Sequence, residues 1–314
     1  MKRVLVTGAS GFIGRHCLPM LVARGYEVHA LSRRLPVTAL PEVFWHESDL
    51  LKPGCAAELL GEVRPAFLLH LAWYAEPGKF WEARENIEWV RASLEVLCAF
   101  ADNGGERMVA AGSCAEYGCS AGECKESTTP LLPTTLYGAS KHALEMILRA
   151  SSRQTSLSSA WGRIFFLYGP HEHTSRLVAY VVRSLLGGEP ALCSEGRQVL
   201  DFMHVEDAAS AFVALLESAV QGPVNIGSGN PVAVRDVLRE IGQQLGQMEL
   251  IRFGARSPIA EPSGFWASTQ RLADEVNWAP RFDLTRGIEQ TIEWWRSSIA
   301  RGRENVDVVG SRRP

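Results

Sequence analysis

Ser113, Tyr137 and Lys141 are the side chains whose types and spacing suit acid–base chemistry. Tyr137 and Lys141 stand four residues apart at the start of an expected helix, so they share one face of it. An ammonium there can stabilise a tyrosinate and bring a phenol pKa of about 10 nearer to neutral. Ser113 ends an expected strand and points into the crevice where parallel sheets bind ligands. A Tyr-x-x-x-Lys pair alone is typical of a surface helix, so the surrounding elements decide.

The N-terminal stretch predicts a strand, a tight glycine turn and a helix. Val4-Leu5-Val6 is a short apolar run typical of a buried parallel strand, and the helix begins near Phe12 and ends near residue 24. Gly8 permits the turn, Gly11 lets the backbone approach a pyrophosphate, and Gly14 lets the helix pack close to the strand. The helix N-terminus favours an anion. Turns are glycine-rich in general, but the strand before and the helix after favour a dinucleotide site.

The next strand, 26–31, ends in Ser32-Arg33-Arg34. Folds that bind NAD place a carboxylate here, on the adenosine ribose. This sequence has two guanidinium groups instead, and arginine suits a 2′-phosphate. The pattern therefore favours NADP, with NAD as the alternative and a solvated loop as the reading without function.

The whole pattern predicts an α/β fold, a Rossmann-type doubly wound parallel sheet with a smaller C-terminal substrate-binding region. Residues 1–168 form the dinucleotide-binding domain, 169–301 the substrate-binding region, and 302–314 a flexible tail, with about 201–227 packing back on the first domain. Further strands are expected at 43–46, 66–72, 108–111, 158–167 and 224–227, and helices at 55–63, 81–100, 136–149, 176–186, 207–217, 234–245 and 284–299.

Composition limits the class of partner. The 314 residues carry a net charge of −3, with 21% charged residues, so no basic field attracts nucleic acid. Apolar runs fall short of the roughly 18 residues that cross a membrane, and no cleavable leader is visible. Seven scattered cysteines do not resemble a disulfide framework, and Cys114, Cys119 and Cys124 lack the partners of a zinc site. We expect a cytoplasmic protein without metal and with a small-molecule ligand.

Taken together, these residues resemble the extended short-chain dehydrogenase/reductases of the NAD-dependent epimerase/dehydratase family, which act on nucleotide-diphosphate sugars. The resemblance covers roughly residues 2–296. It rests on Thr7–Gly14, Asp49-Leu50, His70-Leu71-Ala72, Asn86, Ser113, Tyr137-x-x-x-Lys141, Arg163, Tyr168-Gly169-Pro170, Asp201-Phe202-x-His204-Val205-x-Asp207 and Asn225–Gly229.

The resemblance implies that Tyr137 exchanges the proton, that Ser113 shares the substrate oxygen, and that Lys141 holds the nicotinamide ribose. It also implies a homodimer through the helices near 81–100 and 136–149. Cofactor contacts are expected from Gly8, Ser10, Gly11, Phe12, Ile13, Gly14, Ser32, Arg33, Arg34, Asp49, Leu50, Leu71, Ala72, Trp73, Tyr137 and Lys141, with Asp49 at the adenine amino group. Substrate contacts are expected from Trp73, Ser113, Cys114, Glu116, Phe166, Arg176 and Arg197.

Three departures from the family pattern are informative. The family commonly has Asn where this chain has Phe166, and Arg where it has Leu200, both near the sugar diphosphate. Charge there is left to Arg197, Arg256, Lys79 or Arg271, among which the sequence does not choose. Sugar 4,6-dehydratases have Thr-Asp-Glu-x-Tyr-Gly where this chain has Ser113-Cys114-Ala115-Glu116-Tyr117-Gly118, so the acid pair for water elimination is absent.

The leading hypothesis is an NADP(H)-dependent reductase of a 4-keto, 6-deoxy nucleotide-diphosphate sugar. The alternative is an NAD-dependent nucleotide-sugar 4-epimerase, which recycles its cofactor within one turnover and needs no fresh hydride. A non-catalytic dinucleotide sensor can share the fold, but it has no need of Tyr137, Lys141 and Ser113 together. Phe166 has two readings, as part of an apolar sugar pocket that favours a deoxygenated sugar or simply as core.

Overall fold

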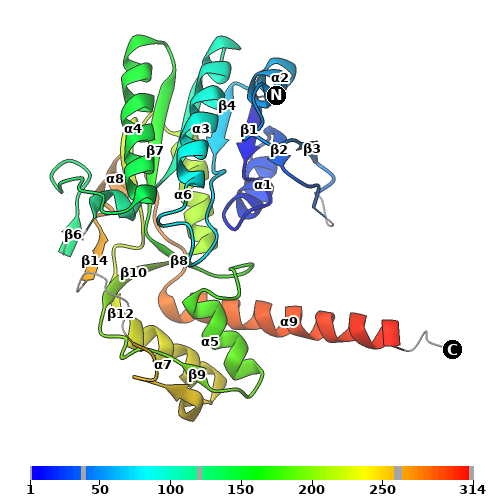
Figure 1. The fold of residues 1–314 in the computed structure, drawn as a ribbon, viewed down its shortest axis with the longest axis vertical. Coiled ribbons are helices and arrows are strands. Elements are labelled where there is room, and N and C mark those ends of the chain that lie inside the picture. Colours follow the sequence, from blue (N-terminus) through cyan, green and yellow to red (C-terminus); the bar gives the residue numbers. More distant parts are fainter. Residues whose placement is uncertain (1, 37–39, 119–121, 258–263, 311–314) are drawn as a thin grey trace.

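The computed structural model describes residues 2–36, 40–118, 122–257 and 264–310, with side chains described up to residue 301; Cys119 lies outside these ranges. A seven-stranded sheet forms the larger half (Figure 1). Its order is β11-β7-β5-β4-β1-β2-β3 and every neighbouring pair is parallel. The strands are β1 Arg3–Thr7, β2 Glu27–Ser32, β3 Val43–Glu47, β4 Phe67–His70, β5 Arg107–Ser113, β7 Ser158–Ile164 and β11 Gly222–Ile226.

Helices cover both faces of this sheet because its strands send apolar side chains both ways. Val4 and Val6 of β1 join one buried cluster and Leu5 joins the opposite one, as the pleat of a strand requires. α1 (Gly14–Ala23) and α6 (Val205–Glu217) cover the first face. α2 (Cys55–Val63), α3 (Glu85–Asp102) and α4 (Leu136–Gln154) cover the other. The sequence prediction of a doubly wound Rossmann-type sheet is confirmed.

A second sheet supports the smaller half. Its order is β12-β10-β14-β6, and β8 pairs with β10. The strands are β6 Gly122–Cys124, β8 Phe166–Tyr168, β10 Val199–His204, β12 Pro231–Ala233 and β14 Gly264–Ala267, and β9 Ala191–Leu192 pairs with β13 Ile251–Arg252. α5 (Leu177–Leu186), α7 (Val234–Leu245) and α9 (Leu284–Gly310) share its apolar core, and the short elements are η1 Cys114–Tyr117, η2 Met248–Leu250 and α8 Gln270–Asp274.

The structure differs from the sequence prediction at several element ends. The run 158–167 is two strands, not one, because the chain leaves the large sheet at Phe165 and continues as β8 in the second sheet. α1 begins at Gly14 rather than near Phe12, and β4 is shorter than 66–72. α9 extends to Gly310, past the expected helix end at residue 299.

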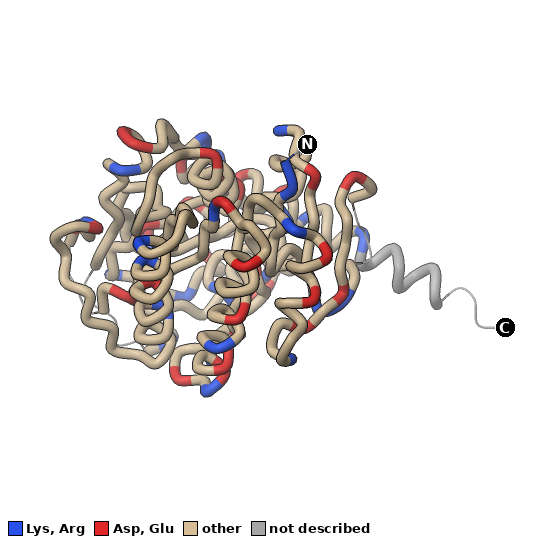
Figure 2. Tube along the Cα trace, turned by 90° about the horizontal axis from the view of Figure 1, so that it is seen from above, with Lys and Arg blue, Asp and Glu red and all other residues tan. Residues whose placement is uncertain are grey.

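Positively and negatively charged residues are mixed over the described part of the molecule, without a large region of one charge (Figure 2). Lys, Arg, Asp and Glu are interspersed along the chain (Figure 2). Within the described residues, no helix has both the length and the apolar character that a membrane crossing requires.

Candidate active site

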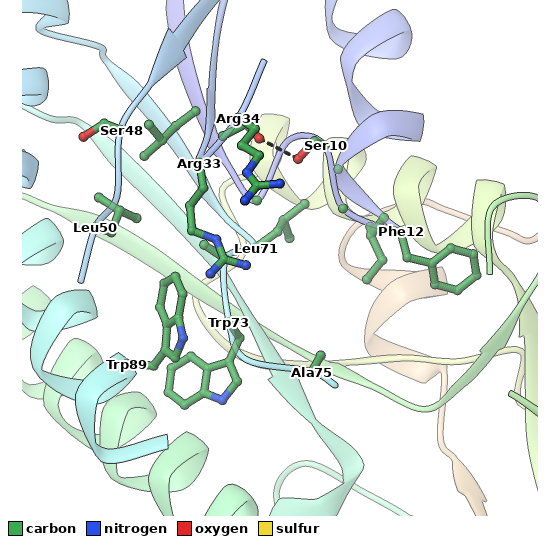
Figure 3. A pocket seen from close by; sticks show the side chains of 17 residues that line it. Ser10, Phe12, Arg33, Arg34, Ser48, Leu50, Leu71, Trp73, Ala75 and Trp89 are labelled. Carbon is green, nitrogen blue, oxygen red and sulfur yellow. Dashed lines mark hydrogen bonds between the residues drawn. The ribbon is translucent and has the colours of Figure 1, made fainter. Parts of the chain in front are cut away.

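A pocket of about 820 Å³ opens at the carboxyl ends of β1, β2 and β4 (Figure 3). This is the edge at which open parallel sheets bind ligands. Seventeen residues line it: Gly8, Ser10, Gly11, Phe12, Ile13, Gly14, Leu31, Ser32, Arg33, Arg34, Ser48, Leu50, Leu71, Ala72, Trp73, Ala75 and Trp89. Thirteen of the sixteen expected cofactor contacts are in this set, and Asp49, Tyr137 and Lys141 are not.

The glycine turn leaves no room for side chains, so its backbone can approach a dinucleotide closely. Gly8 has φ +66°, and a Cβ there would lie 2.8 Å from the Ala72 nitrogen. A Cβ on Gly11 would lie 2.9 Å from the Gly8 carbonyl oxygen, and one on Gly14 would collide with the same oxygen. The turn therefore stays bare and tight, and α1 starts directly behind it, as a pyrophosphate site requires.

The end of β2 presents positive charge to the pocket. The Ser10 and Ser32 hydroxyl oxygens lie 2.7 Å apart, which ties the glycine turn to the β2 end. Arg33 and Arg34 are exposed and line the pocket, as Figure 3 shows. Among the described residues that line it, none is acidic. A guanidinium without an acid beside it is suited to a phosphate group.

The end of β4 is fixed by a buried hydrogen-bonded chain. Thr7 Oγ1 lies 2.8 Å from His70 Nδ1, and His70 Nε2 lies 2.9 Å from Ser93 Oγ. Thr7 Oγ1 also accepts from the Ala72 backbone N–H at 3.2 Å. Burial lowers the pKa of His70 to about 3, and the charge of Lys141 acts in the same direction. His70 is therefore neutral and holds the backbone that lines the pocket.

Lys141 lies under the indole of Trp73. Its Nζ is 3.7 Å from the Trp73 ring centroid and donates to the Ala111 carbonyl oxygen at 2.9 Å. Trp73 is itself held because its Nε1 donates to Asn86 Oδ1 at 2.9 Å. Lys141 is only 4% exposed, and this burial lowers its pKa to about 7, although the charge of Glu116 opposes the shift. The ammonium and the neutral amine are thus both accessible near neutral pH.

Tyr137 lies at the start of α4 in an aromatic setting. Its ring packs edge-on against Phe80 and Trp81, at centroid distances of 4.8 and 5.8 Å. Burial raises the Tyr137 pKa to about 12, while hydrogen bonding with Ser113 and the charge of Arg176 oppose the rise. The expected lowering of the phenol pKa is therefore not found. Desolvation of the phenolate dominates, and Lys141, with its Nζ 6.0 Å from the Tyr137 ring centroid, is itself partly neutral.

Ser113, Cys114 and Glu116 differ in whether their polar side-chain atoms are available to a substrate. The Ser113 Oγ accepts from the Ala115 N–H at 3.2 Å, which leaves its own proton to be donated. Cys114 is buried, and burial raises the pKa of its thiol. Glu116 is fully buried, and its carboxylate contacts protein groups rather than open surface. Of the expected substrate contacts in this stretch, Ser113 is the one whose side chain hydrogen-bonds with Tyr137.

The other expected substrate contacts are spread over the smaller half. Phe166 is half-buried and packs against Phe202 and Phe265, at centroid distances of 6.1 and 5.6 Å. Arg176 lies with its guanidinium carbon 5.5 Å from the Phe80 ring centroid, so it adjoins the aromatic group around Tyr137. Arg197 is exposed, with Glu195 at 3.9 Å. Of the two arginines expected to contact substrate, Arg176 is therefore the one that lies near Tyr137.

The candidates for the diphosphate differ in how far their charge is already engaged. Leu200 is buried in β10, so it offers only packing. Arg271 donates to Glu275 and to the Pro223 and Gln221 carbonyl oxygens. Arg256 stacks on the Tyr180 ring at 4.8 Å, and Lys79 is exposed. Arg271 is therefore the least available of the four cations named from the sequence.

Sequence reasoning missed Leu31, Ser48, Ala75 and Trp89, which also line the pocket. Leu31 and Ser48 are next to Ser32 and Asp49, which the sequence did indicate. Both lie at the carboxyl ends of β2 and β3, so their position at a strand end could have identified them. Asp49 accepts from the Leu51 N–H at 3.1 Å, and its neighbours Ser48 and Leu50, rather than Asp49, line the pocket. Trp89 lies on α3, and no local pattern distinguishes it from core.

The fold and the pocket define a dinucleotide-binding enzyme of the extended short-chain dehydrogenase/reductase type. Residues 4–227 match the NAD dependent epimerase/dehydratase family, and the chain belongs to it. The chain is 27% identical to a UDP-glucose 4-epimerase from Azospirillum brasilense, with 95% of this chain and 92% of that protein covered.

It is also 27% identical to a dTDP-4-dehydro-6-deoxy-D-allose reductase from Streptomyces bikiniensis, with 94% and 96% covered. Among solved structures, MoeE5 in complex with UDP-glucose and NAD is 29% identical, with a TM-score of 0.82 and with 95% of this chain and 99% of that chain covered. The relatives are named for nucleotide-sugar chemistry, and MoeE5 binds NAD beside a nucleotide sugar. The resemblance seen in the sequence is confirmed.

Proposed function

We propose that this enzyme reduces a 4-keto, 6-deoxy nucleotide-diphosphate sugar with NADPH. The observation that carries the proposal is the pair Arg33 and Arg34 on the pocket wall, without an acid among the described lining residues. A reductase consumes hydride at every turnover and draws it from the reduced cofactor pool. Residues suited to the 2′-phosphate of NADPH at the β2 end support that use. The dTDP-4-dehydro-6-deoxy-D-allose reductase among the relatives supports the same reaction class.

In this proposal the chain's own residues manage the oxygen and its proton. NADPH, when bound, supplies the hydride for C4 of the sugar. Ser113 donates its hydroxyl proton in a hydrogen bond to the ketone oxygen, and Tyr137 protonates that oxygen. Burial raises the pKa of Tyr137 to about 12, so the phenol carries its proton at neutral pH before the ketone is reduced. Lys141, whose pKa is lowered to about 7, holds the ribose hydroxyl groups of the cofactor. In its protonated form it places a positive charge near the Tyr137 ring, which stabilises the phenolate left after the proton is given.

A deoxygenated sugar suits the side chains around the site. Trp73 lines the pocket beside Lys141, and Phe80 and Trp81 pack on Tyr137. Phe166 is half-buried where the family commonly has asparagine. Such surfaces offer few partners for hydroxyl groups, and an unpaired hydroxyl is costly to bury. We therefore propose that the sugar lacks the 6-hydroxyl.

The second candidate is an NAD-dependent nucleotide-sugar 4-epimerase. It is favoured by the similarity to the Azospirillum brasilense epimerase and to MoeE5, which was solved with UDP-glucose and NAD. In that reaction Tyr137 removes the proton of the C4 hydroxyl and later returns it. Burial raises the pKa of Tyr137, so the phenol is protonated at neutral pH in the free enzyme whichever reaction it serves, and the shift does not separate the two candidates.

Two reactions separate the candidates. Purified enzyme is given UDP-glucose without added cofactor, and separately a panel of 4-keto-6-deoxy sugar nucleotides with NADPH. The reductase proposal predicts NADPH oxidation in the second reaction, seen as loss of its near-ultraviolet absorbance. Interconversion of C4 epimers in the first reaction, together with stable NADPH in the second, contradicts the reductase and supports the epimerase.

We also propose that two copies associate through α3 and α4, which lie side by side in Figure 1. Ile87, Met146 and Ile147 on these helices are 56%, 45% and 42% exposed. Exposed apolar residues on adjacent helices are suited to a helical interface. Light scattering of the wild type and of Ile147→Glu tests this; a monomeric wild type at micromolar concentration contradicts it.

A further inference from the structure

A buried carboxylate lies directly behind Ser113. Glu116 Oε1 accepts from the Ser113 backbone N–H at 2.8 Å and from Trp161 Nε1 at 2.9 Å. Glu116 Oε2 accepts from Arg163 Nε at 2.8 Å. Glu116 and Arg163 are 0% and 1% exposed. Three donors, one at the end of β5 and two on β7, thus converge on one carboxylate.

The surroundings are shaped to hold this carboxylate. A Cβ on Gly112 would collide with Trp161 Nε1 and lie 2.7 Å from Glu116 Oε1, so glycine is required there. Arg163 continues the network, because its Nη1 donates to the Tyr117 hydroxyl at 3.3 Å. The Tyr117 hydroxyl in turn donates to Asn225 Oδ1 at 2.8 Å. Burying an ion pair is costly unless its hydrogen bonds are satisfied, and here they are.

These contacts leave little scope for a direct reaction of Glu116 with substrate. The carboxylate has no exposed surface, and its oxygens are already engaged by Ser113, Trp161 and Arg163. What the contacts do fix is Ser113. Its N–H is held by Glu116 and its Oγ accepts from Ala115 in the same turn, η1. Ala115 occupies one lone pair of the Ser113 Oγ, so the hydroxyl proton and the second lone pair remain on the side of Tyr137 and the substrate oxygen.

We propose that Glu116 is the positioning residue of Ser113: its buried carboxylate, anchored on Arg163 and Trp161, sets the backbone from which the Ser113 hydroxyl reaches the substrate oxygen. The proposal rests on the role of Ser113 in the proposed function. Glu116 therefore acts through Ser113, and it is not the substrate contact that its place in the sequence suggests.

A double-mutant cycle tests the functional part. Ser113→Ala removes the hydroxyl and is expected to lower kcat by roughly 10², and Glu116→Gln is expected to lower kcat with little change in the NADPH KM. If Glu116 works through Ser113, adding Glu116→Gln to Ser113→Ala changes kcat by less than about twofold. Losses that multiply in the double variant overturn the proposal.

Tyr117→Phe is the matched control, because it removes the bonds of the Tyr117 hydroxyl to Asn225 and Arg163 but leaves the three hydrogen bonds of the Glu116 carboxylate in place. We expect its kcat to stay within about threefold of wild type, although its melting temperature falls. A loss in Tyr117→Phe equal to that in Glu116→Gln assigns the effect to general destabilisation and overturns the proposal.

Hydrogen exchange of the Ser113 amide tests the positioning role without any enzyme assay. The Ser113 amide proton, followed by NMR, is expected to exchange at least tenfold faster in Glu116→Ala than in Tyr117→Phe, because only the first loses its acceptor. Equal exchange in the two variants overturns the positioning role whatever the substrate. An inactive wild type with the expected exchange contradicts the proposed function alone.

Discussion

Replacing Lys141 by methionine measures how much the buried ammonium of Lys141 lowers the stability of the folded protein. Lys141 is 4% exposed and its pKa falls from 10.5 to about 7. Because the folded-state pKa is lowered, the unfolded chain binds more protons between about pH 7 and 10.5, and stability must rise with pH through that window. The full difference corresponds to about 5 kcal/mol at low pH, at 1.36 kcal/mol per pKa unit. Lys141→Met removes this term and also leaves the Ala111 carbonyl oxygen without its donor.

The pH dependence isolates the charge from that lost hydrogen bond, which does not titrate. Between pH 6.5 and pH 9 the cost of Lys141 falls by roughly 2–3 kcal/mol. The wild type is therefore expected to gain that much stability relative to Lys141→Met over this interval, measured by urea unfolding at both pH values without cofactor. Parallel pH profiles for the two proteins would refute the reasoning, since they mean that Lys141 is solvated or ion-paired in the folded state.

Three further changes test other parts of the site. Replacing Arg33 and Arg34 with alanine should weaken NADPH binding by about 1.5–3 kcal/mol per lost contact and leave NADH nearly unchanged in a fluorescence titration; equal weakening of both contradicts the 2′-phosphate assignment. Tyr137→Phe should reduce turnover by roughly 10²–10⁴ while NADPH still binds, and near-normal turnover would assign the proton to another group. Gly14→Ala should lower the melting temperature and dinucleotide affinity together, because its Cβ would collide with the Gly8 carbonyl oxygen; an unchanged melting curve contradicts that account of the turn.

The local pattern of the sequence determined the order of elements and the position of the cofactor pocket. The run Val4-Leu5-Val6 followed by Gly8, Gly11 and Gly14 predicts a strand, a turn and a helix because each residue type suits one backbone conformation. Parallel strands end at a common edge, so the ends of β1, β2 and β4 were predictable as pocket walls. These are consequences of spacing along the chain, which the sequence shows directly.

The tertiary structure alone decided the electrostatics and the far contacts. The Tyr-x-x-x-Lys spacing suggests a lowered phenol pKa, but burial of both groups raises one pKa and lowers the other. From its place three residues after Ser113, Glu116 is expected to contact substrate. In the structure Arg163 and Trp161, both on β7, donate hydrogen bonds to its carboxylate. Desolvation and pairing depend on which side chains meet across the sheet, and a sequence lists those groups without stating which of them touch.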